Sequence, residues 1–234
     1  MEQLFYQPNL ATGIDYLGEE ESKHCIKVLR KKSGEPFLLT DGKGYYYEAT
    51  IKEANPKRCT FLVNRKYPEP VHDFNIHLAI SPTKNPDRLE WMVEKCVEVG
   101  IDAITFIHCE NTERPWLKTE RLKKVALSAM KQSQRATLPV LSELVPLQEF
   151  FKSLPGNTQR FIAHVDASNP DHLVRKVGKG HNYIVLVGPE GDFSPSELEY
   201  SQQFDFLKVS LGKNRLRTET AGLFACTVLN LVNS

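Results

Sequence analysis

The segments VGPEGDFSPSE at Val187–Glu197 and LGKNRLRTETA at Leu211–Ala221 decide the fold of this chain. Each follows a short apolar run that is typical of a buried strand, and each leads into a helix-like sequence. In an open α/β sheet, such loops gather at the carboxyl ends of the strands, where ligands bind. We therefore expect the two glycine-containing loops to lie side by side and to hold a nucleoside-like ligand. A plain β-to-α turn explains the first loop, taken alone, equally well.

The first loop contains two glycines and is followed by a strong sequence signal for the start of a helix. Gly188 and Gly191 allow close approach of a ligand to the main chain. Ser194 and Glu197 have the spacing of a capping box, with Pro195 at the first helical position. The chain contains neither GxGxxG nor GxxxxGK[ST]. A dinucleotide fold of the usual kind and a nucleoside triphosphatase therefore lose support.

Strands and helices alternate through the segment 73–234, which we expect to be one α/β domain. After Asn85, a suitable N-cap, and Pro86, apolar residues recur with helical spacing up to Gly100. This pattern predicts a mostly parallel sheet covered by helices on both faces. The expected strands are 75–80, 103–107, 160–165, 183–187 and 206–210, and the expected helices are 86–99, 119–134, 195–202 and 220–232.

Residues 1–70 show a different pattern and are expected to form a separate β-rich domain. Short β-branched or aromatic runs at 36–40, 45–51 and 59–63 are separated by turn residues, which predicts a small barrel or sandwich. One helical piece is expected at 20–29. The segment 67–70, with two prolines, is expected to be a stiff linker.

Composition narrows the class of protein without choosing a function. The chain has 234 residues, a net charge of +1 and 41% hydrophobic residues, which fits a globular protein and neither indicates nor excludes nucleic-acid binding. Five dispersed cysteines without a CxxC pair argue for a reducing compartment. The amino-terminal sequence lacks the pattern of a signal peptide, and we expect a cytoplasmic protein without a membrane span. The seven histidines lack metal-ligand spacing, so we expect no metal site.

Three groups of cations are candidates for contact with phosphate. The second loop carries Lys213, Arg215 and Arg217, and Arg217 stands beside Thr218 and Glu219, where a salt bridge or a substrate contact is plausible. The other two groups are a helical stripe at Lys23, Lys27, Arg30 and Lys31, and the helix end at 131–135 with Lys131 and Arg135. Solvated surface cations, ion pairs and helix-dipole effects explain the same residues.

Together these residues resemble the SPOUT-class methyltransferases, specifically the bacterial RsmE-type enzymes that methylate N3 of a uridine in 16S ribosomal RNA. The resemblance covers nearly the whole chain, and LGKNRLRTETA is its most specific motif. The other marks are Phe5-Tyr6, His24-x-x-Lys27-Val28-Leu29-Arg30, Gly34, Asp41-Gly42, Lys84-x-x-Asp87-Arg88-Leu89-Glu90-Trp91-Met92-Val93-x-Lys95, Glu98-Val99-Gly100, Gln132-x-x-Arg135 and VGPEGDFSPSE.

The resemblance implies a fold, a cofactor and an oligomeric state. It implies a PUA-like RNA-binding β-barrel at 1–70 and an α/β domain at 73–234 with a deep trefoil knot. General rules of chain topology disfavour such a knot, so this expectation depends on the resemblance alone. It further implies bent S-adenosyl-L-methionine and a homodimer whose methyl-transfer site lies near the dimer interface. The implied cofactor residues are Val187, Gly188, Pro189, Glu190, Gly191, Ser210, Leu211, Gly212, Leu216, Arg217, Thr218 and Ala221, with Ser81-Pro82-Thr83 as a third wall.

Roles in the reaction follow from the same resemblance. Arg217 is the first candidate to stabilise negative charge on the base, Arg135 the second, and Glu219 a weaker candidate for positioning or proton removal. Lys27, Arg30 and Arg135 are expected to contact RNA. The chain departs from the family pattern at Asp192 and Gln134, where glycine is common, and at Lys131, where glutamate is common.

Two other functions remain open at this point. The first is a SPOUT methyltransferase that acts on another RNA or another atom, such as a ribose 2′-hydroxyl. The second is an RNA-binding or ribosome assembly module that keeps the fold as a scaffold and has no catalytic activity. The LRTETA motif and the β-rich domain in front of it favour the uridine-N3 methyltransferase.

Overall fold

The computed structural model describes residues 3–70, 72–113, 116–166 and 171–234, which divide between two compact units. The first unit contains residues 1–71 and 127–138, and the second contains residues 72–126 and 139–234. Helix α3 (Thr119–Gln132) therefore contributes to both units. No helix within the described ranges is long and apolar enough to span a bilayer.

The second unit is built on a parallel sheet of six strands in the order β10-β8-β9-β5-β6-β7. Its strands are β5 (Ile76–Ile80), β6 (Ala103–His108), β7 (Val140–Pro146), β8 (Thr158–Ala163), β9 (Asn182–Val187) and β10 (Leu207–Val209). Every neighbouring pair is parallel. The α/β class and the parallel sheet are confirmed, whereas β7 was not predicted.

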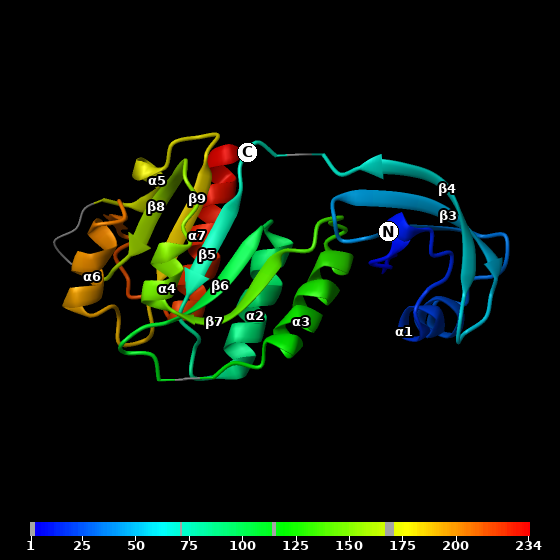
Figure 1. Cartoon of the computed structure of the whole chain (residues 1–234), viewed down its shortest axis with the longest axis horizontal. Coiled ribbons are helices and arrows are strands. Elements are labelled where there is room, and N and C mark those ends of the chain that lie inside the picture. Colours follow the sequence, from blue (N-terminus) through cyan, green and yellow to red (C-terminus); the bar gives the residue numbers. More distant parts are fainter. Residues whose placement is uncertain (1–2, 71, 114–115, 167–170) are drawn as a thin grey trace. The chain divides into compact units, whose positions relative to one another are not determined.

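Helices cover both faces of this sheet, as the sequence predicts. On one face α7 (Thr218–Asn233) packs against α2 (Pro86–Glu98), β5 and β9 (Figure 1). Gly222 permits this contact, because a β-carbon there would lie 2.9 Å from Ile80 Cδ1 and 3.1 Å from Leu78 Cδ2 and Met92 Sδ. On the other face α4 (Leu147–Lys152) and α6 (Pro195–Gln202) bury apolar side chains against the sheet.

Local signals in the sequence fix where the main helices begin. Asn85 accepts a hydrogen bond from the amide of Asp87 at 2.8 Å and caps α2, with Pro86 at its first position. Ser194 and Glu197 form the predicted capping box of α6. Helix α7 begins two residues before its predicted start. The short helix α5 (Leu173–Lys176) was not predicted.

The first unit contains a four-stranded sheet in the order β1-β2-β3-β4. Its strands are β1 (Leu4–Tyr6), β2 (Pro36–Thr40), β3 (Tyr45–Glu53) and β4 (Thr60–Pro68), and β1 pairs with β2 in parallel while the other pairs are antiparallel. The rings of Phe5, Phe37 and Phe61 meet edge to face, with centroids 5.5 and 5.6 Å apart, and form the centre of the core. A one-turn helix, η1 (Leu10–Thr12), follows β1.

Two predictions for the first unit need correction. The expected linker 67–70 is wrong for its first half, because β4 continues to Pro68 and Tyr67 pairs with Tyr46 of β3. The helical piece at 20–29 is also irregular. It consists of α1 (Glu19–Lys23) followed by a π-helical turn, η2 (His24–Val28), so its cations do not follow simple α-helical spacing.

Candidate active site

The loop after β9 is held in place by contacts along most of its length. Gly188 and Pro189 are buried, and the amide of Asp192 donates to the carbonyl of Pro189 at 2.9 Å. The side chain of Asn111 donates to the carbonyls of Gly191 and Asp192 at 3.3 and 3.0 Å. These bonds come from the segment after β6, so the neighbouring strand fixes the conformation of the loop.

Asp192 occupies a backbone conformation that favours glycine, with φ of 63°. Its carboxylate accepts hydrogen bonds from the amides of Phe193 at 2.8 Å and Val165 at 3.2 Å. The ring nitrogen Nδ1 of His164 lies 3.0 Å away but is not aligned for a hydrogen bond. An aspartate tolerates this left-handed conformation because its short polar side chain binds nearby amides.

The loop after β10 is more exposed and contacts the first loop at two points. Thr218 Oγ1 donates to the carbonyl of Gly188 at 3.2 Å, and Arg215 Nη2 donates to the carbonyl of Glu190 at 2.9 Å. Gly212 has φ of 130°, and no atom lies within 4 Å of the position that a β-carbon would take. The structure therefore brings the two loops together and leaves space beside the backbone of the second.

The first turn of α7 carries one exposed cation and one buried carboxylate. Arg217 is the exposed N-cap residue of α7. The side chain of Glu219 is only 7% exposed, and its Oε1 lies 3.8 Å from Nε of Arg88. Within the described residues, Oε2 of Glu219 has no hydrogen-bond partner. The helix dipole favours a carboxylate at this position.

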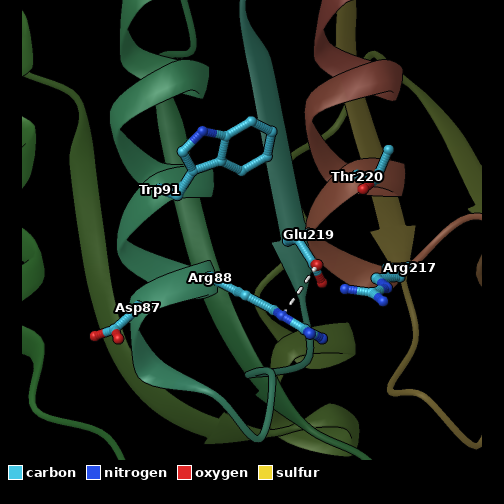
Figure 2. Close-up of a pocket in the computed structure, with 6 residues that line it drawn as sticks. All are labelled: Asp87, Arg88, Trp91, Arg217, Glu219 and Thr220. Carbon is cyan, nitrogen blue, oxygen red and sulfur yellow. Dashed lines mark ion pairs between the residues drawn. The ribbon is translucent and has the colours of Figure 1, made fainter.

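These side chains border a cavity of about 530 Å³ on the face where α2 and α7 meet. Figure 2 shows Arg88 reaching from α2 toward Glu219, with Trp91 one turn further along α2 and Arg217 at the start of α7. The six lining residues are Asp87, Arg88, Trp91, Arg217, Glu219 and Thr220. Arg217 and Glu219 were predicted site residues. Arg88 and Trp91 had been noted only as family marks, although their spacing of three places them on one face of a helix.

The predicted third wall lies at the end of β5 and uses its hydroxyl groups within the protein. Ser81 and Thr83 are both buried. Ser81 Oγ forms a hydrogen bond with Thr112 Oγ1 at 2.9 Å, and its amide donates to the carbonyl of Val187 at 3.0 Å. Thr83 Oγ1 donates to the carbonyl of Asn85 at 2.8 Å. The Ser81 amide therefore holds the end of β9, where the first loop begins.

The remaining predicted residues lie in the first unit. Lys27 and Arg30 are exposed, and Arg30 has φ of 57° at the end of the π-helical turn. Lys131 forms an ion pair with Glu21, in which both side chains are largely buried. Arg135 is partly buried and follows α3.

Gln134, the second departure from glycine, also has a positive φ, of 58°. Its carbonyl accepts a hydrogen bond from the hydroxyl of Tyr46 at 2.7 Å. Burial, and then the neighbouring carboxylate of Glu69, raise the pKa of Tyr46 to about 12, so this hydroxyl stays protonated and keeps donating.

The described part of the chain contains no group of three potential metal ligands. All five cysteines are free and buried, and they fill the core as small apolar residues.

Comparisons with known proteins match this architecture. A family model described as "RNA methyltransferase domain" matches residues 70–230. The chain belongs to the RNA methyltransferase family. A second model, "RNA methyltransferase PUA domain", matches residues 17–64 of this RNA methyltransferase. The fold is therefore α/β with a PUA-like amino-terminal domain.

Individual relatives of this RNA methyltransferase align over nearly its full length. The crystal structure described as "probable rRNA-methyltransferase" from Porphyromonas gingivalis is 42% identical, with a TM-score of 0.92 over 99% of this chain and 98% of the other. The ribosomal RNA small subunit methyltransferase E from Neisseria gonorrhoeae, bound to S-adenosyl methionine, is 27% identical, with a TM-score of 0.88 over 100% and 98%. The ribosomal RNA small subunit methyltransferase E from Bacillus subtilis is 24% identical over 90% of this chain and 87% of its own length.

Proposed function

We propose that this RNA methyltransferase transfers a methyl group from S-adenosyl-L-methionine to N3 of a uridine in 16S ribosomal RNA. The observation that carries the proposal is the junction of the two glycine-containing loops, through Thr218 and Arg215, beside a cavity with Arg217 and Glu219. The relatives that are named as small-subunit ribosomal RNA methyltransferases support the substrate.

The two loops have the features that a nucleoside-like methyl donor requires. Buried Gly188 and Pro189 form a fixed wall, and the open space beside Gly212 lets a ligand approach the main chain. When bound, S-adenosyl-L-methionine supplies a methyl group on a positively charged sulfur. We assign its binding to Val187, Gly188, Pro189, Glu190, Gly191, Ser210, Leu211, Gly212, Leu216, Arg217, Thr218 and Ala221.

The residues around the cavity have to prepare N3 of the uridine. N3 carries a proton at neutral pH, and removal of that proton places negative charge on the ring oxygens O2 and O4. Arg217, an exposed cation beside the cavity, is suited to stabilise this charge. Arg135 is the second candidate for the same role, and Glu219 is a candidate to position the base or to accept the proton.

The finer features of the fold belong to the same proposal. We assign residues 1–70 to a PUA-like β-barrel that binds RNA and residues 73–234 to a SPOUT domain with a trefoil knot. The knot is assigned on the resemblance alone. Exposed Phe224 and Leu231 on α7 support a homodimer, because apolar side chains on a helix surface suit a second copy. A ribosomal substrate implies action in the cytoplasm.

Contact with the RNA backbone is assigned to Lys27 and Arg30, both exposed in the first unit. Replacement of both by alanine should weaken RNA binding and reduce the slope of log K against log salt by about 1.5, since each lost phosphate contact removes about 0.7–0.9. Titrations of labelled RNA at several salt concentrations measure this slope. An unchanged slope and affinity would reject the assignment.

The reaction itself is tested by mass spectrometry of nucleosides from 16S ribosomal RNA. A strain that lacks the gene should lose one N3-methyluridine, and the wild-type gene should restore it. Loss of a different methylated nucleoside would move the activity to another atom or another site. No change in any nucleoside would favour a non-catalytic RNA-binding module.

A further inference from the structure

The cavity between α2 and α7 contains a buried carboxylate oxygen that lacks a donor. The Glu219 side chain is 7% exposed, and in the described part of the chain nothing donates a hydrogen bond to its Oε2. Its other oxygen lies 3.8 Å from Nε of Arg88, beyond normal hydrogen-bond length. A buried acceptor without a partner is costly, so this oxygen points to a donor that arrives with a ligand.

The walls around this oxygen suit a flat ring. The cavity volume of about 530 Å³ lies within the range of small-molecule sites. Trp91 lines the cavity and is 43% exposed. Figure 2 shows its indole above Arg88 on the same helix. Aromatic side chains stack on nucleobases in proteins that bind unpaired nucleotides.

We infer that this cavity receives the pyrimidine ring of the target nucleotide, with Trp91 stacked on the ring and Glu219 facing N3. This inference rests on the proposed function and adds to it the recognition of the base. Uracil carries hydrogen on N3 and donates to a carboxylate, whereas N3 of cytosine is an acceptor and meets the carboxylate oxygen with a lone pair. The Glu219 side chain therefore selects uracil over cytosine, because the wrong base leaves two acceptors unpaired.

Glu219 also accepts the proton in this arrangement. The N3–H bond breaks, the proton moves to Oε2 of Glu219, and the electron pair stays on N3, where it forms the bond to the incoming methyl group. The carbon–sulfur electron pair leaves with the sulfur of the methyl donor. Glu219 becomes a neutral carboxylic acid and later returns its proton to solvent.

Arg88 is the positioning residue for this step. Oε2 of Glu219 has almost no exposed surface, so the side chains that cover it must shift before a base can reach it. The Arg88 side chain is 43% exposed and its contact with Glu219 is long, so little free energy opposes the movement. While the proton moves, negative charge passes from the carboxylate to the ring oxygens, and the guanidinium of Arg88 beside Glu219 can stabilise this charge.

Fluorescence of Trp91 tests base binding directly. The chain has two tryptophans, so Trp116→Phe leaves Trp91 as the single reporter. A short single-stranded RNA with one uridine should quench this fluorescence and bind about tenfold more tightly than the same RNA with cytidine, a difference of about 1.4 kcal/mol. Equal quenching by both RNAs would overturn the inference. A change in Trp91 fluorescence that depends on protein concentration and not on RNA would also overturn the inference. Such a change would show that the face with Trp91 contacts a second copy of the protein.

Substitutions at two residues test the proton step. Glu219→Gln keeps the shape and still accepts a hydrogen bond, so uridine RNA should still quench Trp91 while the methylation rate falls by about 10²–10⁴-fold. Arg88→Gln should lower the methylation rate while uridine RNA still quenches Trp91, and Arg88→Lys, which keeps the positive charge, should recover part of the rate. Glu199→Gln, an exposed carboxylate on α6, is the matched control, and thermal unfolding monitors the fold of all four variants.

The outcomes separate this inference from the proposed function. Wild-type activity in Glu219→Gln, or wild-type activity in Arg88→Gln, would overturn the role of the respective residue and leave the methyltransferase assignment intact. A wild-type protein that methylates no uridine N3 would refute the proposed function itself.

Discussion

The two glycine-containing loops differ in how the protein holds them. The loop after β9 is buried at Gly188 and Pro189 and receives hydrogen bonds from Asn111. The loop after β10 is exposed from Gly212 to Arg215 and depends on its contacts with the first loop. One wall of the site is therefore fixed by the sheet, and the other is an exposed cationic segment that can adjust to a ligand.

The largest expected effect separates two arginines of the second loop. Arg217→Ala should lower the methylation rate by about 10²–10³-fold, because the lost cation stabilises charge that develops during the reaction. Binding of S-adenosyl-L-methionine should change far less. Single-turnover assays and calorimetry measure the two quantities.

Arg215→Ala is the matched control for Arg217. Arg215 donates to the carbonyl of Glu190 from an exposed position, so its loss should cost about 0.5–1.5 kcal/mol of loop stability and have a much smaller effect on rate. Equal losses of activity in both variants would remove the special role of Arg217 and leave only a general effect of charge.

A second pair of variants compares the glycines of the two loops. A β-carbon at Gly188 would lie 3.0 Å from the ring of Phe193, whereas at Gly212 it would meet no atom but would have φ of 130°. Both Gly188→Ala and Gly212→Ala should lower the free energy of unfolding by about 1–3 kcal/mol, the first through crowding and the second through backbone strain. Urea unfolding measures both.

A rescue experiment separates these two causes. Phe193→Leu reduces the ring that a β-carbon at residue 188 would meet, so it should recover part of the stability lost in Gly188→Ala. The same change should not help Gly212→Ala. Recovery in both variants, or in neither, would show that the two loops are not constrained in these different ways.

The last pair of variants concerns the tip of the first loop. Asp192→Ala loses the bonds to the amides of Val165 and Phe193 and leaves alanine at φ of 63°, which should cost about 2 kcal/mol of unfolding free energy. Asp192→Gly loses the same bonds without the backbone strain and should cost about 1 kcal/mol. If glycine destabilised the protein as much as alanine, the argument from the positive φ would be wrong.

Much of the second unit could be predicted because its local signals agree. Asn85 and Pro86 fix the start of α2, and the capping box at Ser194 fixes the start of α6. The short helices α4 and α5 were missed, because six- and four-residue segments carry too few repeats for periodicity to show. Strand β7 was missed because its residues are at most half-buried and mix apolar with polar side chains.

The first unit was less predictable for two physical reasons. The π-helical turn at His24–Val28 changes the angular spacing of Lys27 and Arg30, which no α-helical pattern reveals. The prolines in 67–70 suggested a linker, but Pro68 ends an edge strand, where proline is tolerated.

The sequence predicted the two loops of the site but did not predict the cavity beside them. Both loops carry glycines and motif residues that stand together in the sequence. Arg88 and Trp91 approach Glu219 from a helix more than one hundred residues earlier, and only the packing of α2 against α7 brings them together. Asp192 and Gln134 both have a positive φ, a backbone conformation that favours glycine and that the sequence alone does not disclose.

The assignment of the two loops to the methyl donor can be tested by a crystal structure of the protein grown with S-adenosyl-L-methionine. We expect density for the donor between Val187–Gly191 and Ser210–Ala221, with its methyl group directed toward the cavity at Arg217 and Glu219. A donor bound elsewhere on the chain, or saturating donor with both loops empty, would contradict it.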